Sequence, residues 1–277
     1  MPVDDAGPDG PLRSRMTRRR GTLGVIAAGA TAAGPVLHGL RVAAREEGYV
    51  LSVFSVPGPG SAALMAAADG LRLQGVAGIV VLDARLVAEL GAVHGIPLVP
   101  AASTDQYAGA RRATEHLLDL GHPTVWHLGG PEDGPIARAR ERGWRETLER
   151  HGAEIPPVVR GDWSARSGYR AGQSLAVESG VEAVFSANDH MALGLLAAFT
   201  EAGMSVPRDA HVVGFDDVPE AAYYAPPLTT VRQDFVAAGR QTLATLAARI
   251  AGVAAPARAS VEGELVVRES SRCLQSG

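Results

Sequence analysis

Two pairs of polar residues follow apolar runs that are typical of buried strands. Asn188 and Asp189 come after the run AVFS, and Asp216 and Asp217 come after VVGF. A carboxylate at such a strand end can accept two hydrogen bonds from sugar hydroxyls, and its charge strengthens each bond. The alternative for Asp216 and Asp217 is a solvated turn. The alternative for Asp189 is a helix N-cap, which would leave Asn188 free to face a ligand.

Further candidates lie on the segment 135–151, whose residue spacing predicts a helix. Arg140 and Trp144 are four residues apart, so they share a face with Ile136 and Leu148. We expect Trp144 to pack in the core. Arg140 is selected over the other arginines of the segment because it aligns with this apolar stripe. The others, expected at the surface, are Arg138, Arg142, Arg145 and Arg150.

Trp163 stands in the sequence GDWS, on a loop that follows a predicted strand and precedes a helix capped by Ser164. An aromatic side chain at this place offers a flat apolar face to a sugar ring. Packing within the protein is the alternative role for Trp163. Together with the strand-end residues, it indicates a binding site for a small polar molecule.

No set of residues with catalytic spacing accompanies these candidates. The sequence contains no GxSxG, no GxxxxGK[ST] and no HExxH, and its eight histidines have no metal-ligand spacing. Gly21, Gly24 and Gly29 do not form the dinucleotide-binding pattern GxGxxG. The sequence therefore predicts neither an enzyme nor a cofactor or metal site.

The elements that must position the candidates form two series of alternating strands and helices. Such alternation predicts parallel sheets covered by helices on both faces. The first series has predicted strands at 22–28, 50–56, 78–82 and 97–101, with helices at 35–47, 61–73, 85–93 and 105–120. Asp105 is placed to cap the last of these helices.

The second series has predicted strands at 124–128, 158–160, 183–186 and 211–214, with helices at 135–151, 165–177 and 189–202. A short strand at 228–231, a helix at 235–251 and a strand at 265–267 then return through both series. Two such lobes would place a cleft at the carboxyl ends of their strands, where open α/β sheets bind ligands. All of the polar candidates follow strands or face the same edge, as this arrangement requires.

Composition narrows the class of protein. The chain has 277 residues and 46% hydrophobic side chains, so it can bury a full core. Its 26 basic and 30 acidic residues give a formal charge of −4, without the positive field of a surface that holds nucleic acid unaided. We therefore expect the folded part to bind something small.

The sequence also bears on compartment. Cys273 is the only cysteine and cannot form an internal disulfide. No apolar run near the start has the character of a signal peptide, and none elsewhere reaches the roughly 18 residues that span a bilayer. We expect a cytoplasmic protein without membrane contact. Residues 1–20 are interpreted as a flexible basic tail.

A set of motifs between about residue 21 and residue 270 resembles the lactose/galactose-repressor family of transcription regulators, and the motifs occur in family order. They are GTLGVI (21–26), GARRATEHLLDLGH (109–122), ARARERGW (137–144), GDWSARSGY (161–169), SANDHMALG (186–194), VVGFDDVPEAAYYAPPLTTVRQDF (212–235) and LVVRES (265–270). The resemblance implies the periplasmic-binding-protein-like type I fold, with two Rossmann-like lobes joined by several crossovers. It implies one lobe from 21–103 plus about 232–262, and a second from 104–231 plus about 263–277.

The resemblance also implies roles for individual residues. Arg140, Asn188 and Asp216 match the arginine, asparagine and aspartate that hold ligand hydroxyls in this family. Other positions match aromatic, polar or helix positions that line the same pocket; these are Trp163, Gln233, Phe235 and Ile136. A small-molecule effector, a mono- or disaccharide, and a homodimer are implied as partners.

The sequence departs from the family pattern in two places. In the first lobe, Ala28, Leu82 and Ala102 stand where sugar-binding members often carry polar side chains, so half of the hydroxyl-reading groups are missing. At the start, about 20 residues precede the core, and LRSRMTRRR (12–20) resembles only the end of a hinge and its linker. We expect no base-reading helical headpiece within these residues, so operator binding is expected only where such a headpiece is present.

The leading hypothesis is therefore an effector-sensing, dimerising regulator core. The apolar residues Val36, Leu40, Leu64 and Leu71 on first-lobe helices are candidates for the dimer interface, with core packing as their alternative. A second hypothesis is a stand-alone cytoplasmic solute-binding protein of the same fold. A third is a sugar-acting α/β enzyme that uses Asp216 or Asp217 as a general base.

Overall fold

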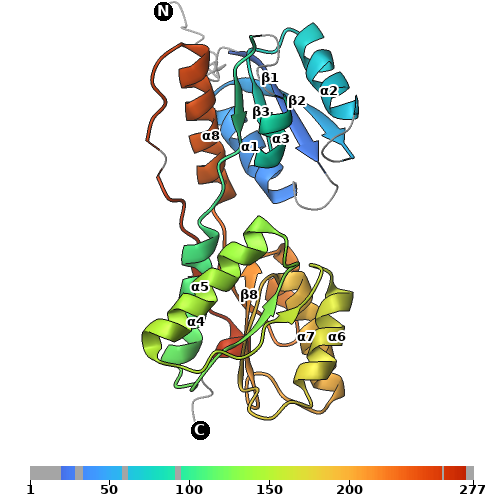
Figure 1. The fold of residues 1–277 in the computed structure, drawn as a ribbon, viewed down its shortest axis with the longest axis vertical. Coiled ribbons are helices and arrows are strands. Elements are labelled where there is room, and N and C mark those ends of the chain that lie inside the picture. The colour runs from blue at the N-terminus through green and yellow to red at the C-terminus, as the bar shows by residue number, and fades with distance from the viewer. Residues whose placement is uncertain (1–19, 29–33, 58–61, 91–94, 258, 273–277) are drawn as a thin grey trace, which may run out of the picture. The chain divides into compact units, whose positions relative to one another are not determined.

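The computed structural model describes residues 20–28, 34–57, 62–90, 95–257 and 259–272, in two compact units (Figure 1). The first unit extends to Ala102 and also includes Gly239–Ala257, and the second comprises Ser103–Ala238 and residues 259–272. Apart from Arg20, the predicted tail lies outside the described residues.

The lobe boundaries differ in detail from the predicted ones. Residues 232–238 and 259–262 group with the second unit, whereas the sequence predicted them in the first. The hydrogen bonds of these segments explain the difference. Gln233 donates to Asp216 at 2.6 Å, and the Ser260 hydroxyl donates to Asp105 at 2.7 Å.

The first unit is built on a four-stranded parallel sheet with strand order β2-β1-β3-β4. Its strands are β1 (Gly21–Ala28), β2 (Tyr49–Val56), β3 (Ile79–Val81) and β4 (Leu98–Pro100). Its helices are α1 (Gly34–Glu46), α2 (Ala62–Leu73), α3 (Ala84–Leu90) and most of α8 (Phe235–Ile250).

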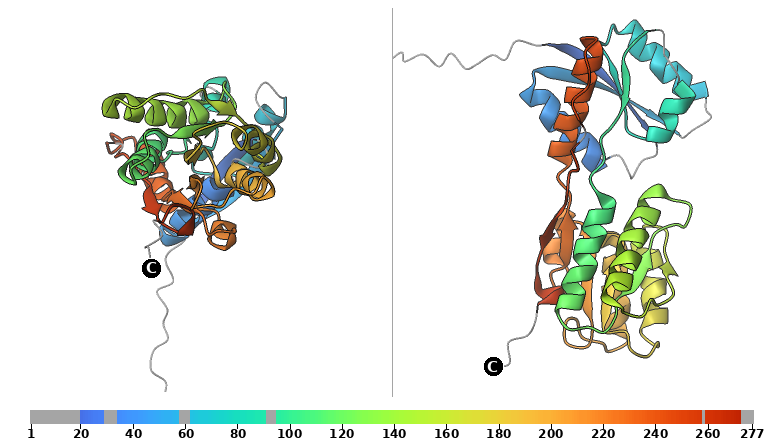
Figure 2. Two further views of the ribbon diagram at one scale, coloured as in Figure 1. Left: turned by 90° about the horizontal axis from the view of Figure 1, so that it is seen from below. Right: turned by 60° about the vertical axis from the view of Figure 1, so that its left-hand side comes forward.

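Two apolar layers cover the faces of this sheet. Leu23 and Val25 of β1 pack with Leu40 of α1 and Leu246 of α8 on one face, where α1 and α8 lie side by side (Figures 1 and 2). On the other face α2 and α3 pack through a second cluster that includes Ile26, Leu64, Leu71, Val81 and Leu86. Alternation along β1 thus sends successive side chains to opposite layers.

Three of the four residues that were candidates for a dimer interface lie in these core layers. Leu40, Leu64 and Leu71 are at most 2% exposed and belong to the two clusters, and Val36 is half-buried. A helix that covers a parallel sheet must bury its apolar stripe against that sheet, so the same stripe is not available to a second chain. These three leucines therefore pack in the core, which was the alternative to a place in the dimer interface.

The second unit contains a six-stranded sheet with strand order β10-β9-β8-β7-β5-β6. Its strands are β5 (Trp126–Gly129), β6 (Val159–Arg160), β7 (Ala183–Ser186), β8 (His211–Asp216), β9 (Thr229–Arg232) and β10 (Glu264–Val266). Its helices are α4 (Gln106–Asp119), α5 (Pro135–His151), α6 (Ala165–Leu175) and α7 (Asp189–Glu201), with short 3-10 turns at η1 (Pro219–Tyr223) and η2 (Glu269–Ser271).

Helices α4 and α5 cover one face of this sheet, and α6 and α7 cover the other (Figures 1 and 2). Trp144 is fully buried in the first of these layers, and its ring nitrogen donates to the Val125 carbonyl at 2.7 Å, which confirms its predicted core role. Helices α6 and α7 approach closely at glycines: a Cβ on Gly194 would lie 1.9 Å from the Ala165 carbonyl oxygen.

The predicted α/β class with two parallel sheets is confirmed, with one addition. Strand β10 pairs with β9 in the antiparallel sense, so the second sheet carries an antiparallel edge strand. The predicted helix caps also form: Asp105 accepts from the Ala108 amide at 2.8 Å, and Ser164 accepts from the Ser167 amide at 3.1 Å. None of the described helices is long and apolar enough to cross a membrane.

Candidate functional site

Arg140 and Asp216 form an ion pair at the carboxyl-end edge of the second sheet. Asp216 ends β8, and Arg140 projects from α5. Nη2 of Arg140 lies 2.9 Å from Oδ1 of Asp216, and their side chains are 4% and 24% exposed. Burial raises the pKa of the Asp216 carboxyl, and the adjacent Arg140 guanidinium opposes that shift. Because a guanidinium remains protonated in proteins, Arg140 supplies a fixed positive charge here.

Arg140 is held on several sides. Nε donates to Oε1 of Gln106 at 2.8 Å, and Nη1 donates to the carbonyl of Ala187. The guanidinium carbon lies 3.8 Å from the centre of the Phe215 ring, which is a close cation–π contact. The orientation of the guanidinium is therefore set by groups from α4, β8 and the loop after β7.

Both members of the pair keep unused hydrogen-bonding positions. Oδ1 of Asp216 accepts from Arg140 and from Nε2 of Gln233 at 2.6 Å, whereas no hydrogen bond joins Oδ2 to any residue that the structure describes. A guanidinium has five N–H groups. Three of those of Arg140 are engaged with described residues, which leaves two. A free carboxylate oxygen beside free N–H donors suits a ligand that presents neighbouring hydroxyls.

The other arginines of α5 differ from Arg140 as the sequence predicted. Arg142, Arg145 and Arg150 pair with glutamates while remaining solvent-accessible, and Arg138 donates to the Asp133 carbonyl. Such exposed pairs contribute little to stability. Only Arg140 among these five is buried and joined to a strand-end carboxylate.

Asn188 corrects one expectation. Asn188, and not Asp189, is the N-cap of α7: Oδ1 accepts from the Met191 amide at 2.9 Å, and Nδ2 donates to the Trp163 carbonyl at 3.0 Å. The side chain is therefore not free, although Nδ2 has a second N–H group. Asn188 connects α7 to the loop that carries Trp163.

Asp189 is instead buried beneath the site. Oδ1 accepts from the Thr230 hydroxyl at 2.6 Å and Oδ2 accepts from the Val218 amide at 2.9 Å. Burial raises the pKa of this carboxyl to about 7, and the nearby Asp216 and Asp217 carboxylates act in the same direction. Gly214 makes room for it, since a Cβ there would lie 2.2 Å from Oδ1.

Trp163 occupies a constrained loop position. Its backbone has a φ of 75°, which is unusual for a bulky residue. Its ring packs over Gly130, where a Cβ would lie 2.4 Å from the ring, and its centre is 5.7 Å from the Arg140 guanidinium carbon. Trp163 is half-buried and also contacts the α6–α7 core layer, so packing and an exposed ring surface coexist.

Gln233 and Phe235 are placed differently. Gln233 is buried and bonded to Asp216, as described above. Phe235 is the first residue of α8 and is half-buried. Ile136 is 45% exposed on α5, one turn before Arg140. Thus Asp216 contacts both Arg140 and Gln233, and Asn188 is joined to Trp163.

Thr104 and Gln106 were missed by the sequence analysis. Thr104 is 4% exposed, and its hydroxyl donates to Oε1 of Gln233. Gln106 donates from Nε2 to Thr104 Oγ1 and to Gln233 Oε1, each at 2.7 Å. Both follow β4 by a few residues, so the strand-end criterion that selected Asp216 could have found them with a wider window.

Asp217 has a structural partner set. Arg232 donates to Oδ2 at 2.6 Å and Arg268 donates to Oδ1 at 2.7 Å, and the carboxylate is 8% exposed. The solvated-turn alternative is therefore wrong for Asp217. Asp216 and Asp217 have φ values of 107° and 52°, a strained pair of positions that this double ion pair stabilises.

The first-unit positions that depart from the family pattern are apolar or occupied. Leu82 is half-buried against the α1–α8 core layer. Ala102 is 8% exposed, and its amide donates to the Thr242 hydroxyl at 2.8 Å. The side chain of Ala28 lies outside the described residues. Within the residues that the structure describes, no group of His, Cys, Asp and Glu could hold a metal ion.

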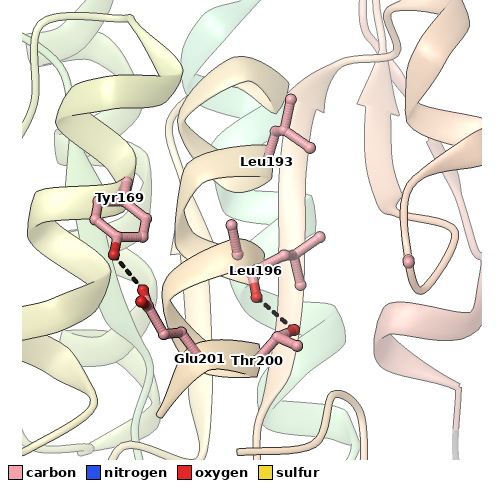
Figure 3. A pocket seen from close by; sticks show the side chains of 7 residues that line it. Tyr169, Leu193, Leu196, Thr200 and Glu201 are labelled. Carbon is pink, nitrogen blue, oxygen red and sulfur yellow. Dashed lines mark hydrogen bonds between the residues drawn. The ribbon is translucent and has the colours of Figure 1, made fainter.

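A separate open groove lies on α6 and α7 (Figure 3), with a volume of about 470 Å³. Its lining is mostly apolar, with Tyr169 hydrogen-bonded to Glu201 across the two helices. Leu193, 40% exposed, is part of this lining. The groove shares no lining residue with the Arg140–Asp216 group, so it is a different surface feature.

Residues 114–271 match the family model of the periplasmic binding protein-like domain. The Lactose operon repressor of Escherichia coli (strain K12) is 32% identical over 253 residues, which cover 85% of this chain and 70% of the repressor. The chain therefore belongs to the lactose-repressor family of transcription regulators. It spans from 48% to 70% of the length of such curated relatives.

Solved structures agree with the family and the fold. The Lac repressor dimer bound to operator and the anti-inducer ONPF has a TM-score of 0.79 and 30% identity, with 90% of this chain and 93% of that chain covered. The transcriptional regulator CelR–cellobiose complex has a TM-score of 0.78 and 30% identity, covering 90% and 84%. These relatives are regulators rather than enzymes, in line with the sequence prediction. In this chain both oxygens of Asp217, one of the two candidates for a general base, are bound by arginines and are not open to a substrate.

Proposed function

We propose that this chain is the effector-sensing core of a cytoplasmic transcription regulator, and that its second unit binds a mono- or disaccharide or a similar polyol. The observation that carries the proposal is the ion pair between the buried Arg140 guanidinium and the half-buried Asp216 carboxylate, with unused hydrogen-bonding positions on both partners. A buried ion pair contributes little net stability by itself. An ion pair at the end of a strand that keeps unused hydrogen-bonding positions is therefore suited to binding a ligand.

The chemistry favours neighbouring hydroxyl groups. One ligand hydroxyl would donate to Oδ2 of Asp216 and accept from a free N–H of Arg140, and the next would extend the same pattern. The remaining N–H of Asn188 Nδ2 adds a donor, and the Trp163 ring offers an apolar face to a sugar ring. Ile136, exposed one turn from Arg140, can contact an apolar part of the ligand. Gln233 and Phe235 would complete this surface.

Two relatives of known structure support the ligand class. The Lac repressor structure contains the anti-inducer ONPF, and the CelR structure contains cellobiose. Since Ala28, Leu82 and Ala102 bring no polar side chain from the first unit, we infer that the second unit supplies most of the hydroxyl recognition here. An effector with one less polar side would suit this distribution.

The proposed output is control of operator binding by a DNA-binding headpiece. An effector shifts a conformational equilibrium only by its difference in affinity for the two states. Sensing therefore requires that the pair be presented differently in those states, so that the ligand binds one of them more tightly.

We also propose that two copies associate through the groove on α6 and α7 (Figure 3). Leu193, which lines this groove, is 40% exposed although it is a large apolar side chain, and the rest of the lining is mostly apolar. Contiguous exposed apolar surface of this kind marks interaction sites. The Lac repressor relative is described as a dimer, which favours a second copy of this chain as the occupant.

A thermal-shift screen with monosaccharides and disaccharides, including lactose and cellobiose, tests the ligand proposal. A true effector at about 100-fold above its Kd should raise the Tm by about 5 °C or more. Because sugars also stabilise proteins nonspecifically, the control is Arg140→Lys, which keeps the charge but loses the guanidinium fork. Equal shifts in both proteins for every sugar would contradict the proposal.

A further inference from the structure

Three side chains outside the ion pair form a hydrogen-bonded cluster that contacts both of its members. Gln106 accepts from Nε of Arg140 at 2.8 Å, and Gln233 donates to Oδ1 of Asp216 at 2.6 Å. The two glutamines are joined at 2.7 Å, and Thr104 bonds to each of them. Thus Arg140 and Asp216 are connected twice, once directly and once through the cluster.

The direction of every bond in the cluster is fixed by its charged ends. Arg140 can only donate, so the oxygen of the Gln106 amide must face it. An ionised Asp216 can only accept, so the nitrogen of the Gln233 amide must face Asp216. The Gln106 nitrogen then donates to the Gln233 oxygen at 2.7 Å, and the Thr104 hydroxyl accepts from Gln106 while donating to Gln233. No donor opposes another donor in this arrangement.

The cluster also lies near two of the three places along the sequence where the chain passes between its units. Thr104 and Gln106 follow the boundary at Ala102 by two and four residues, and Gln233 precedes the boundary at Ala238. Thr104 and Gln233 are 4% and 9% exposed, so their hydrogen bonds are shielded from water. A change at either crossing would therefore reach the partners of Arg140 and Asp216 directly.

We propose that Gln106 is a positioning residue of the effector site, which orients the Arg140 guanidinium for ligand hydroxyls and, with Thr104, ties it to the Gln233 side chain that holds Asp216. The effector part of this inference rests on the proposed function. The positioning of Arg140 does not, because the hydrogen bonds exist without a ligand.

The first experiment follows the Arg140 Nε–H group by NMR in the unliganded full chain, with its resonance assigned by its loss in Arg140→Lys. In the wild-type protein this proton should exchange slowly with solvent. In Gln106→Met, which removes the acceptor at similar size, exchange should become at least about 10-fold faster. Gln106→Glu restores an acceptor and should restore the slow exchange.

The matched control is Gln74→Met, the same substitution at an exposed glutamine of the first unit whose Oε1 accepts from Ser52. It should leave Arg140 exchange unchanged. Should Gln106→Met fail to fold, Thr104→Val removes the hydroxyl that anchors both glutamines and is expected to increase exchange in the same direction. Unchanged exchange in a folded Gln106→Met or Thr104→Val would overturn the inference.

The second experiment is calorimetric titration with cellobiose and lactose. Gln106→Met should weaken binding by about 10-fold or more, because an oriented bond to a charged group is lost. Equal affinity in the two proteins would overturn the effector part of the inference. If neither sugar binds the wild-type protein, the ligand proposal fails for these sugars, and the exchange experiment still decides whether Gln106 positions Arg140.

Discussion

Nη2 of Arg140 lies 2.9 Å from Oδ1 of Asp216, and Gln233 donates to that same oxygen. The two oxygens of the Asp216 carboxylate therefore differ: Oδ1 is bound by the protein, and Oδ2 has no hydrogen-bond partner among the described residues. The two neighbouring carboxylates, Asp189 and Asp217, do not differ in this way, because both oxygens of each are bound by protein groups. This difference singles out Asp216 as the carboxylate that a ligand can use.

Replacement of Asp216 by Asn should affect both stability and binding. It leaves the buried Arg140 without its counter-charge, so the free energy of unfolding should fall by roughly 1–3 kcal/mol. Saccharide affinity should fall at least about 10-fold, because the charged acceptor is lost. Urea unfolding and calorimetry measure the two effects. Asp209→Asn, at an exposed turn before β8, is the control and should change neither by a comparable amount.

Asp189 predicts a pH dependence of stability. Its folded pKa is about 7, above its ordinary value of 3.8, so between these values the folded protein holds a proton that the unfolded chain releases. The stabilising contribution is complete below about pH 4 and is lost as the pH rises to about 7. Stability should thus decline over this window with a slope of up to about 1.4 kcal/mol per pH unit from this group.

The measurement is urea unfolding at a series of pH values for the wild-type protein and Asp189→Asn. The variant should show the flatter curve, since Asn does not titrate and Thr230 can accept a hydrogen bond from its amide. Asp209→Asn should keep the wild-type slope in this window, because the hydrogen bond from the Ser205 amide lowers the pKa of the Asp209 carboxyl. Parallel curves for wild type and Asp189→Asn would contradict the assignment.

The two ion pairs of Asp217 predict that Arg232 and Arg268 contribute unequally to stability. Arg268 is 17% exposed and also donates to the Leu228 carbonyl at 2.8 Å, whereas Arg232 is 51% exposed. Arg268→Ala should lower the free energy of unfolding by roughly 2–3 kcal/mol, and Arg232→Ala by less than about 1 kcal/mol. Chemical denaturation of both variants measures the two losses of unfolding free energy. Equal losses would contradict the predicted difference between Arg268 and Arg232.

The groove on α6 and α7 predicts the effect of a charge at Leu193. Leu193→Asp should convert a dimer to a monomer without unfolding it, because a desolvated carboxylate would oppose association. Analytical ultracentrifugation should show the mass halved. Leu73→Asp, at a first-unit leucine that is 78% exposed, should remain dimeric. A dimeric Leu193→Asp would place the interface elsewhere, and a monomeric wild type would remove the dimer from the proposal.

Much of the fold and part of the site follow from local sequence patterns. Short apolar runs predicted all the parallel strands, and the strand-end position selected Asp216, because the carboxyl ends of parallel strands gather at one edge. The four-residue spacing of Arg140 and Trp144 separated a buried arginine from its exposed neighbours on the same helix. These inferences depend on one element at a time.

What the sequence could not decide depends on contacts between elements. Asn188 and Asp189 are both good N-caps, and the choice between them is set by the space that Gly214 leaves for a carboxylate on the next strand. The partners of Asp217 come from β9 and from the segment after β10. Likewise, Leu40 and Leu71 read as apolar helix residues, and only the packed sheet shows that this face is occupied.

Calorimetric titration of the wild-type chain and Asp216→Asn with cellobiose, lactose and any sugar that raises the Tm tests the central claim most directly. The wild-type protein should bind at least one of these sugars with one site per chain, and Asp216→Asn, still folded, should bind it at least about 10-fold more weakly. A folded wild-type protein that binds none of them, or equal affinity in the two proteins, would contradict the account.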